Sequence, residues 1–297
     1  MEQLLACPLC NNSELKPYGI SADDFLTGSG SYSMCVCEGC GLIFTNPRPK
    51  EEDVWKFYQS SAYISHTRVG QSLKDRLYFA AQRYMLQKKF RLIQSLGLPS
   101  LRLLDYGCGA GAFLHHLYQK GIDAVGFEPN TNAASLARSK GAPVYGTITE
   151  LEQNQPRVFD VVTLWHVLEH SYSPQEAISY IHKRLRPGGW AVIALPMADS
   201  FDSAFYKENW AAYDLPRHLL HFKPTPLIRA FQEQGFQMIQ SQGMPLDAFY
   251  IAWLSESHMG TFAGFLRAFM VAALSNAHAL TGAKSWSSQI FIFQKLQ

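Results

Sequence analysis

The sequence predicts an α/β fold with a mainly parallel sheet, preceded by a small cysteine-rich unit. Apolar, strand-like runs alternate with helix-like segments over residues 101–195. The first run ends in a glycine-rich turn, Gly107–Gly111, and two Cys-x-x-Cys motifs lie near the N-terminus. Strands that alternate with helices form a parallel sheet covered on both faces. A glycine turn between a strand and a helix is where such sheets bind adenosine-containing ligands.

Length and composition indicate an ordered globular protein with a sizeable core. The chain has 297 residues, of which 47% are hydrophobic and 17% charged. The net charge of +2 gives no general case for nucleic-acid binding, although residues 68–91 hold seven basic side chains and one acid. Such a run favours a solvated helix face over a phosphate-binding surface. The N-terminus lacks a signal-peptide pattern, so we expect a cytoplasmic protein with reduced or metal-bound cysteines.

The two cysteine motifs predict a structural zinc site in a unit spanning residues 1–48. Cys7 and Cys10 form the first motif, and Cys37 and Cys40 form the second, 26 residues later. Four thiolates on two short turns make a closed tetrahedral site, to which we assign no catalysis. Cys35 is a further candidate, because it could replace Cys37 as the ligand.

The rest of the chain divides into a helical linker or lid, 49–99, and an α/β domain, 100–297. We predict a long aromatic- and histidine-rich loop over 197–223 and an apolar helical insert over about 244–285. The expected strands are 101–106, 124–127, 143–146, 159–164, 190–195, 236–241 and 288–294, and the main helices are 51–59, 72–96, 111–120, 130–140, 173–185 and 224–235.

The glycine turn by itself fits two cofactor templates. Read as Gly-x-Gly-x-x-Ala, it matches a dinucleotide-binding fingerprint. Read from Asp105, it matches the Asp-x-Gly-x-Gly-x-Gly loop that binds S-adenosylmethionine. An acid at Asp105 suits the cationic methionine end of that cofactor better than a pyrophosphate, and Glu128 ends the next strand, where a carboxylate can bind ribose hydroxyls.

Several motifs in order resemble class I S-adenosylmethionine-dependent methyltransferases, in the group with a ubiquinone-biosynthesis-like methyltransferase domain. They are the turn, Glu128, the segment from Phe159 to His170, the turn Leu185–Gly189 and the terminal strand. The resemblance implies a Rossmann-like sheet of seven mostly parallel strands with a reversed last strand. It places the cofactor at the carboxyl ends of the strands. The cysteine motifs resemble zinc units that precede some sugar C-methyltransferases and one class of ribosomal RNA methyltransferases.

The resemblance also implies cofactor-binding residues. Glu128 would hold the ribose, Pro129 and Ile148 would lie by the adenine, and Trp165 and His166 would border the methionine. The segment 146–150 lacks the early aspartate that is frequent in these enzymes. The methionine and ribose would be lined by Asp105, Gly107, Cys108, Gly109, Gly111 and Phe113.

Histidines are the candidates for a general base, because their pKa is near neutral. His166 and His170 follow the strand 159–164, and His218 and His221 lie in the 197–223 loop. His166, Glu169 and His170 also spell the inverted zincin motif, which requires a helix; here the motif directly follows a strand. For the substrate wall we predict Trp210, Tyr213 and Arg217, with Tyr63 and His66 in a lid.

These observations predict a methyltransferase that acts on a hydroxyl or carbon of a small or medium-sized acceptor such as a sugar, lipid or secondary metabolite. The alternatives are an RNA methyltransferase that uses the zinc unit and the basic helix, and a non-catalytic module that binds the cofactor. The apolar stretch 261–280 predicts a buried helix or dimer contact, with an apolar substrate or a membrane surface as the alternative.

Overall fold

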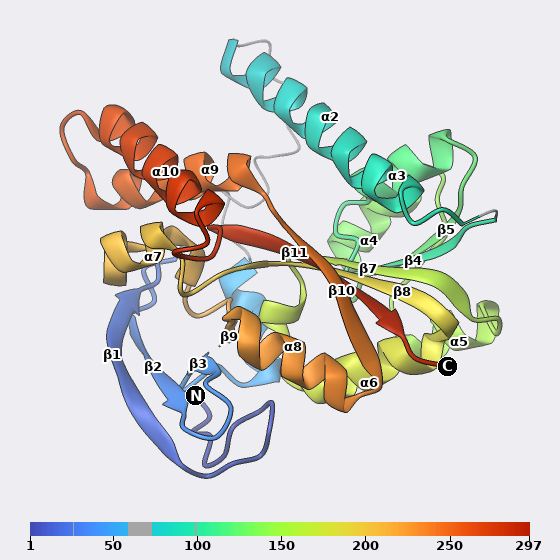
Figure 1. Cartoon of the computed structure of the whole chain (residues 1–297), viewed down its shortest axis with the longest axis horizontal. Coiled ribbons are helices and arrows are strands. Elements are labelled where there is room, and N and C mark those ends of the chain that lie inside the picture. Colours follow the sequence, from blue (N-terminus) through green and yellow to red (C-terminus); the bar gives the residue numbers. More distant parts are fainter. Residues whose placement is uncertain (26, 59–72, 99) are drawn as a thin grey trace.

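The computed structural model describes residues 1–25, 27–58, 73–98 and 100–297. Its centre is a seven-stranded sheet in which β11 runs antiparallel to both of its neighbours and the other neighbouring strands are parallel (Figure 1). This arrangement is the predicted Rossmann-like sheet with a reversed last strand. The strand order is β10 (Phe236–Gly243), β11 (Ser288–Lys295), β8 (Leu185–Pro196), β7 (Phe159–Trp165), β4 (Arg102–Tyr106), β5 (Asp123–Phe127) and β6 (Val144–Tyr145).

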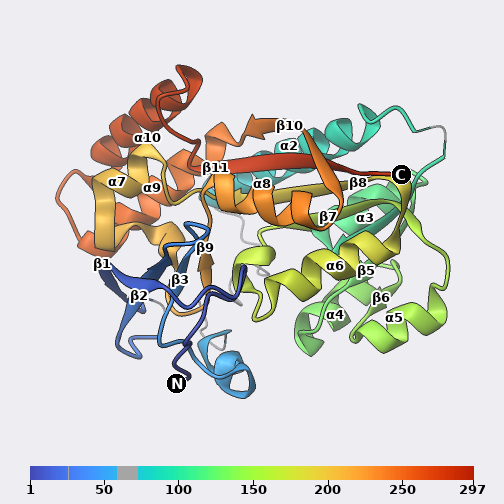
Figure 2. The same cartoon turned by 60° about the horizontal axis from the view of Figure 1, so that its bottom comes forward.

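Helices cover both faces of this sheet (Figure 2). Alternate residues of a strand point to opposite faces, so Leu104 packs into one core cluster and Leu103 into another. One face is covered by α5 (Ile148–Asn154), α6 (Pro174–Arg184) and α8 (Pro224–Glu233), and the other by α2 (Leu73–Gln94), α3 (Ala112–Gln119) and α4 (Thr131–Arg138).

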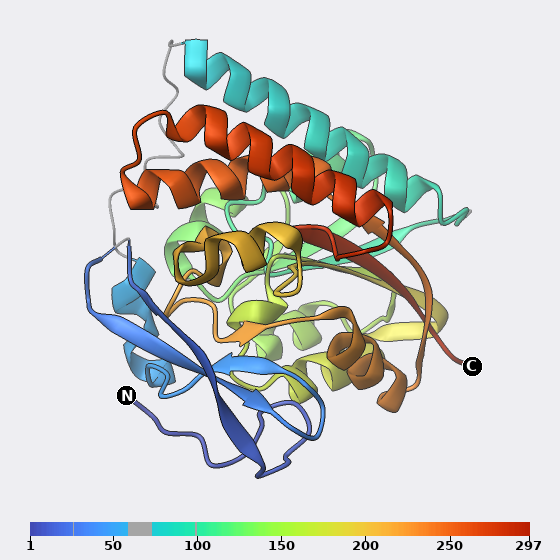
Figure 3. The ribbon, with the colours of Figure 1, turned by 60° about the vertical axis from the view of Figure 1, so that its left-hand side comes forward.

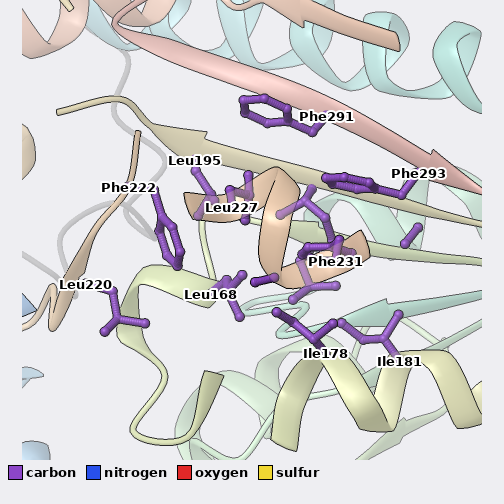
Figure 4. Packing of buried hydrophobic residues seen from close by; sticks show 14 of the residues in the cluster. Leu168, Ile178, Ile181, Leu195, Leu220, Phe222, Leu227, Phe231, Phe291 and Phe293 are labelled. Atoms are coloured by element: carbon purple, nitrogen blue, oxygen red, sulfur yellow. The ribbon is translucent and has the colours of Figure 1, made fainter. Parts of the chain in front are cut away.

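The first core cluster extends beyond the sheet towards the N-terminal unit. Phe231 of α8 stacks on Phe293 of β11 at a centroid separation of 4.1 Å. Ile178 and Ile181 of α6 lie below them, and Phe222 and Leu220 continue the cluster away from the sheet (Figure 4). The same cluster includes Cys7, Leu9, Cys37, Leu42 and Phe44.

The N-terminal unit forms a second sheet that it completes with a strand from the α/β domain. The order is β1 (Leu15–Asp23), β2 (Ser31–Cys37), β3 (Ile43–Thr45) and β9 (Leu220–His221). Phe44 and Ile43 pair with Leu220 and His221. Although the sequence suggests a unit that ends at residue 48, its sheet therefore closes only when residues 220–221 are in place.

The segment 197–223 contains more regular structure than the predicted loop. It holds α7 (Phe201–Tyr206), the 3₁₀ turns η4 (Lys207–Asn209) and η5 (Ala211–Tyr213), and β9. Ser200 caps α7 by accepting a hydrogen bond from the backbone of Ser203. The α7 residue Asp202 is fully buried and accepts hydrogen bonds from Trp210, Ser275 and Ser287. These short turns are thus stabilised by residues distant in sequence. Their own residues show no strong sequence pattern that would predict secondary structure.

Two further helical pieces flank the site. The predicted helix 51–59 is the 3₁₀ helix η1 (Glu51–Tyr58), and η3 (Leu168–His170) follows β7. The apolar insert is a helical hairpin of α9 (Pro245–Met259) and α10 (Gly264–Leu280). Of the alternatives left open for this stretch, full burial within the chain does not describe α10, where small residues face inwards and large apolar ones stay exposed. No helix among the described residues is both long and apolar enough to span a membrane.

Candidate active site

The glycine turn joins the ends of β4 and β5. The backbone N–H groups of Gly107 and Cys108 both donate to the carbonyl of Phe127, at 2.8 and 3.0 Å. The N–H of Gly109 donates to Glu128 Oε2 at 2.9 Å, and Glu128 Oε1 accepts from the backbone of Asn130 at 2.9 Å. The turn and the predicted ribose-binding acid are thus in direct contact.

Glycine is required at the turn for two reasons. Gly107, Gly109 and Gly111 have φ values of +76°, +53° and +72°, in the left-handed region that side chains disfavour. A Cβ on Gly107 would lie 2.5 Å from Val167, and one on Gly111 would lie 2.7 Å from Ala137. A Cβ on Gly109 would meet nothing within 4 Å. The backbone at Gly109 therefore faces open space, which a nucleoside cofactor lying against the turn would use.

Two carboxylates lie at the carboxyl ends of neighbouring strands. Asp105 is buried and accepts a hydrogen bond from Thr163 at 2.7 Å. Burial raises the pKa of Asp105 to about 6, against the opposing effects of Thr163 and Lys89. Burial also raises the pKa of Glu128, against its two backbone donors. A carboxylate that is kept from water is stabilised in its charged form when a cationic or hydroxyl-bearing ligand pairs with it.

Lys89 of α2 is a site residue that sequence reasoning missed. Its Nζ lies 4.3 Å from the ring centroid of Trp165, and burial lowers its pKa to about 8, although Asp105 and Asp247 oppose the shift. In the sequence Lys89 is one of several basic residues in a helical run, and only the packing of α2 on the sheet turns this one inwards. The indole N–H of Trp165 is buried with no hydrogen-bond partner in the described structure.

The remaining predicted cofactor residues have different degrees of burial. Phe113 is buried and meets Trp165 edge-on at 5.5 Å. The thiol of Cys108 lies under the turn, where a Cβ on Gly126 would approach it to 2.6 Å. Ile148 is half-buried at the start of α5, and Pro129 is exposed beyond the end of β5.

His166 links the strand end to the helical hairpin. Its φ is +57°, rare for a residue with a side chain. Its Nε2 lies 3.4 Å from Asp247 Oδ2, and its Nδ1 lies 3.4 Å from Glu169 Oε1. Burial opposes the imidazolium, but these two carboxylates outweigh it and raise the pKa of His166 to about 9. Asp247 was not predicted, because it lies within the apolar insert.

Glu169, His170 and His218 form a compact polar cluster. Their ligand atoms lie within 4.8 Å of one another. The Nδ1 of His170 lies 3.0 Å from the carbonyl of Arg217, to which it donates, and 3.1 Å from the hydroxyl of Tyr58. This leaves Nε2 as the acceptor of the neutral His170 ring. The Nδ1 of His218 lies 2.8 Å from the carbonyl of Ala212, and its Nε2 lies 3.8 Å from Asp214 Oδ2. Burial, and then the charge of His218, lower the pKa of His170 to about 4. The set can exchange a proton or hold a metal ion.

The carboxylate of Glu169 is the unusual member of this cluster. The residue is 1% exposed, and neither carboxylate oxygen has a hydrogen-bond partner within the described part of the chain. Burial opposes its charge, but His166 and the other neighbouring histidines lower its pKa overall. The three residues of the inverted zincin pattern do not share a helix face, since His166 precedes η3 and points to Asp247.

Other predicted site residues are packed inside the protein. The indole of Trp210 donates to Asp202, Arg217 pairs with Asp214 and with Asp24, and the ring of His221 lies 3.2 Å from the hydroxyl of Thr45. Burial lowers the pKa of His221 to about 3. This burial favours structural roles, rather than a place on an accessible substrate wall, for Trp210, Tyr213, Arg217 and His221. Tyr63 and His66 lie outside the described residues.

The four predicted zinc ligands come together. The sulfurs of Cys7 and Cys40 are 3.6 Å apart, those of Cys10 and Cys37 are 3.5 Å apart, and all four lie within 4.8 Å of one another. Zinc–sulfur bonds of about 2.3 Å in a tetrahedron place sulfurs roughly 3.8 Å apart. The thiols therefore fit a zinc ion. Cys35 is not in this group; its sulfur faces the amide of Asn46.

Comparisons with known proteins point to one family. Residues 78–241 match a family model described as a methyltransferase domain. The ubiquinone biosynthesis O-methyltransferase of Burkholderia pseudomallei is 28% identical over 160 residues, which cover 50% of this chain and 69% of that protein. The protein of the same name from Leptothrix cholodnii is 26% identical over 180 residues, covering 54% and 76%.

Solved structures share the fold at low sequence identity. The magnesium protoporphyrin IX methyltransferase of Synechocystis, with bound SAH, aligns with a TM-score of 0.54 and 14% identity, over 83% of this chain and 100% of that one. A cyclopropane synthase of Mycobacterium tuberculosis aligns with a TM-score of 0.51 and 17% identity, over 84% and 98%.

The ion pairs of His166 predict a pH-dependent stability. Because the folded-state pKa is raised from 6.5 to about 9, the stabilisation is complete below pH 6.5 and is lost as the pH rises towards 9. The free energy of unfolding of Asp247→Asn should therefore be lower than that of the unmodified protein by about 1 kcal/mol at low pH, since the ring is partly exposed. This difference should shrink by pH 9.

Asp123→Asn is the matched control, because Asp123 pairs with Arg102, which stays charged over this window. Its effect on the free energy of unfolding should not change between pH 6.5 and 9. An Asp247→Asn effect that is equally constant would contradict the assignment of the ion pair.

Proposed function

This chain belongs to the methyltransferase-domain family and is a class I S-adenosylmethionine-dependent methyltransferase, and on that premise we propose that it methylates a hydroxyl of a small or medium-sized acceptor. The observation that carries the proposal is the pair Asp105 and Glu128 around a turn that is open at Gly109. The relatives named as O-methyltransferases favour oxygen over carbon as the acceptor atom. Membership of an enzyme family leaves a purely non-catalytic module without support.

We assign the cofactor contacts by charge and position. Glu128 would accept hydrogen bonds from the ribose hydroxyls, in place of its present backbone donors. Asp105 would face the ammonium end of the methionine, and the Gly109 backbone would lie against the nucleoside. Lys89, and the indole N–H of Trp165, which has no hydrogen-bond partner among the described residues, are donors that would suit the methionine carboxylate. When bound, S-adenosylmethionine supplies an electrophilic methyl group for in-line displacement.

The chain's own contribution to chemistry is alignment and removal of the acceptor proton. His170 presents Nε2 as a proton acceptor, because its Nδ1 donates to Arg217, and Glu169 lies beside it with Oε1 paired to His166. A hydroxyl placed at this cluster can pass its proton to an Nε2, and Glu169 stabilises the imidazolium that forms. The loop that carries the cluster also supplies Val167, which packs against Gly107 of the cofactor turn.

The RNA alternative depends on the basic residues of 68–91. Part of that run lies outside the described residues, and Lys89 turns inwards to Trp165 and Asp105 rather than outwards to a phosphate backbone. This orientation removes only Lys89 from an RNA-binding face, since Arg83, Lys88 and Arg91 stay exposed. We favour a small-molecule acceptor because the matched relatives are named ubiquinone biosynthesis O-methyltransferases.

Transfer of labelled methyl groups tests the proposed function. The unmodified protein should transfer label from S-adenosylmethionine into a small-molecule fraction of a cell extract, and not into its RNA fraction. With that fraction as acceptor, His170→Asn or Glu169→Gln should lower kcat by about 10²-fold or more, because base catalysis is lost. Affinity for S-adenosylmethionine should stay within a few-fold of the unmodified protein.

Glu233→Gln serves as the control, because Glu233 is an exposed acid at the end of α8 and belongs to none of the predicted cofactor or substrate segments. Label that appears only in RNA would refute the small-molecule acceptor. Full activity of both cluster variants would refute the role assigned to Glu169 and His170.

We also propose that Cys7, Cys10, Cys37 and Cys40 hold a structural zinc ion. The spacing of their sulfurs fits tetrahedral thiolate coordination, and the short unit around them has little core of its own. A closed set of four protein ligands leaves no position for substrate, so the metal would act on folding alone.

Metal analysis of the purified protein should find about one zinc per chain. Cys7→Ser with Cys40→Ser should abolish the zinc and lower thermal stability, because metal binding contributes directly to folding. Cys35→Ser should keep the metal, because its sulfur lies outside the cluster. Zinc that persists in the double variant would contradict this ligand set.

A further inference from the structure

The α9–α10 hairpin carries a broad exposed apolar surface that the methyltransferase site does not use. Phe262, in the loop between the helices, is fully exposed, and Phe265 and Leu266 are 73% and 65% exposed. Monomeric soluble proteins rarely expose contiguous apolar surface on this scale. We define the hairpin surface by Leu246, Tyr250, Trp253, Phe262, Phe265, Leu266, Phe269, Met270 and Leu274.

The helix α10 places its small residues inwards and its large ones outwards. Ala268, Ala272 and Ser275 are buried against α9 and α7, whereas Phe265, Phe269 and Leu274 face solvent. An ordinary surface helix does the reverse, because bulky apolar groups gain most from leaving water. The fold therefore has a tight internal contact made by small side chains and an outer face that is suited to an apolar medium.

Charge is almost absent from the outer face of α10. Arg267 is its one Lys, Arg, Asp or Glu residue, and its Nε lies 3.2 Å from the buried carboxylate of Glu256. On the hairpin surface itself, Tyr250 and Trp253 supply amphipathic rings, a residue type enriched where apolar and aqueous phases meet. The hairpin surface thus combines purely apolar side chains with two aromatic side chains that also carry a polar group.

The hairpin projects from the sheet, and α2 lies on the same side of the molecule (Figures 1 and 3). Exposed basic residues on α2 include Arg83, Lys88 and Arg91. A protruding apolar hairpin beside a basic helix complements an anionic bilayer, in which apolar side chains enter the interface and cations meet lipid phosphates.

We propose that the hairpin surface binds the surface of a lipid bilayer containing anionic lipids, without crossing it. A second copy of the chain is the competing occupant, and it is disfavoured by charge. The exposed basic residues of α2 beside the hairpin complement lipid phosphates but not the same basic helix of a second copy.

Docking in this way would bring the methyl-transfer site to the lipid. Asp247 near the start of α9 pairs with His166 at the end of β7, so the hairpin forms part of the site's border. An acceptor that partitions into the bilayer could then reach the cluster without crossing water. This consequence rests on the proposed function, whereas the docking itself does not.

Vesicle flotation tests the proposal. The full-length protein should float with vesicles of equal parts phosphatidylcholine and phosphatidylglycerol and bind less to phosphatidylcholine alone. The bound fraction should fall as salt rises. Phe265→Ser with Leu266→Ser should reduce binding to the mixed vesicles by about 10-fold or more, because both side chains are exposed and their loss removes only surface apolar area.

Trp55→Ser is the matched control, since Trp55 is an exposed aromatic residue on η1 and is not part of the hairpin surface. It should leave binding unchanged. Failure of the unmodified protein to bind these vesicles, or equal binding by the hairpin variant, would overturn the proposal. Light scattering could instead show that the unmodified protein is a dimer and that the hairpin variant is a monomer. If neither protein bound vesicles, this result would assign the surface to contact with a second copy. Basal methyl transfer in detergent-free buffer measures the proposed function separately.

Discussion

The hydrogen bond from the Gly109 backbone to Glu128 ties the ends of two parallel strands into one turn, and the rest of the site is arranged around it. The Phe127 carbonyl binds the start of the same turn through Gly107 and Cys108. This geometry requires left-handed backbone at the glycines, and it begins α3 directly afterwards. Because Val167 packs on Gly107, the turn also positions the loop that carries His166, Glu169 and His170.

The N-terminal sheet supports the opposite side of the site. Thr45 of β3 is fully buried, donates its hydroxyl to the carbonyl of His218 at 2.8 Å, and donates its backbone N–H to Leu219 at 2.9 Å. Asp24 pairs with Arg217 from the same side. The cysteine-rich unit therefore positions the backbone that carries His218. None of the three residues of the candidate general-base cluster belongs to the cysteine-rich unit itself.

The sequence was sufficient to predict the central fold because each element carries a local signal. Alternating apolar runs mark β4, β5, β7 and β8, and their order determines a parallel sheet with a carboxyl edge. The glycine turn, Asp105 and Glu128 are contiguous with strand ends, so their meeting could be predicted. The cysteine cluster could be predicted for a similar reason, since two short motifs define their own turns.

Residues brought together by packing could not be predicted in this way. Lys89 and Asp247 reach the site from α2 and α9, and nothing in their sequence neighbourhoods separates them from surface charges. From the sequence, Trp210 and Arg217 were expected to lie on an accessible loop. In the structure, hydrogen bonds to Asp202 and Asp24 hold these two side chains inside the protein. What covers the α9–α10 insert could not be predicted, because composition shows only that a helix is apolar, while its neighbours in the fold decide which side is covered.

The glycine turn is the proposed binding site for S-adenosylmethionine, and calorimetric titration tests this assignment directly. The unmodified protein should bind S-adenosylmethionine, and Glu128→Ala should weaken that binding by about 100-fold, as expected for two lost charge-assisted hydrogen bonds. Glu233→Ala, at the exposed end of α8, should bind normally. NADH should not bind. Equal affinity of the Glu128→Ala variant, with its fold intact by circular dichroism, would contradict the assignment of the turn.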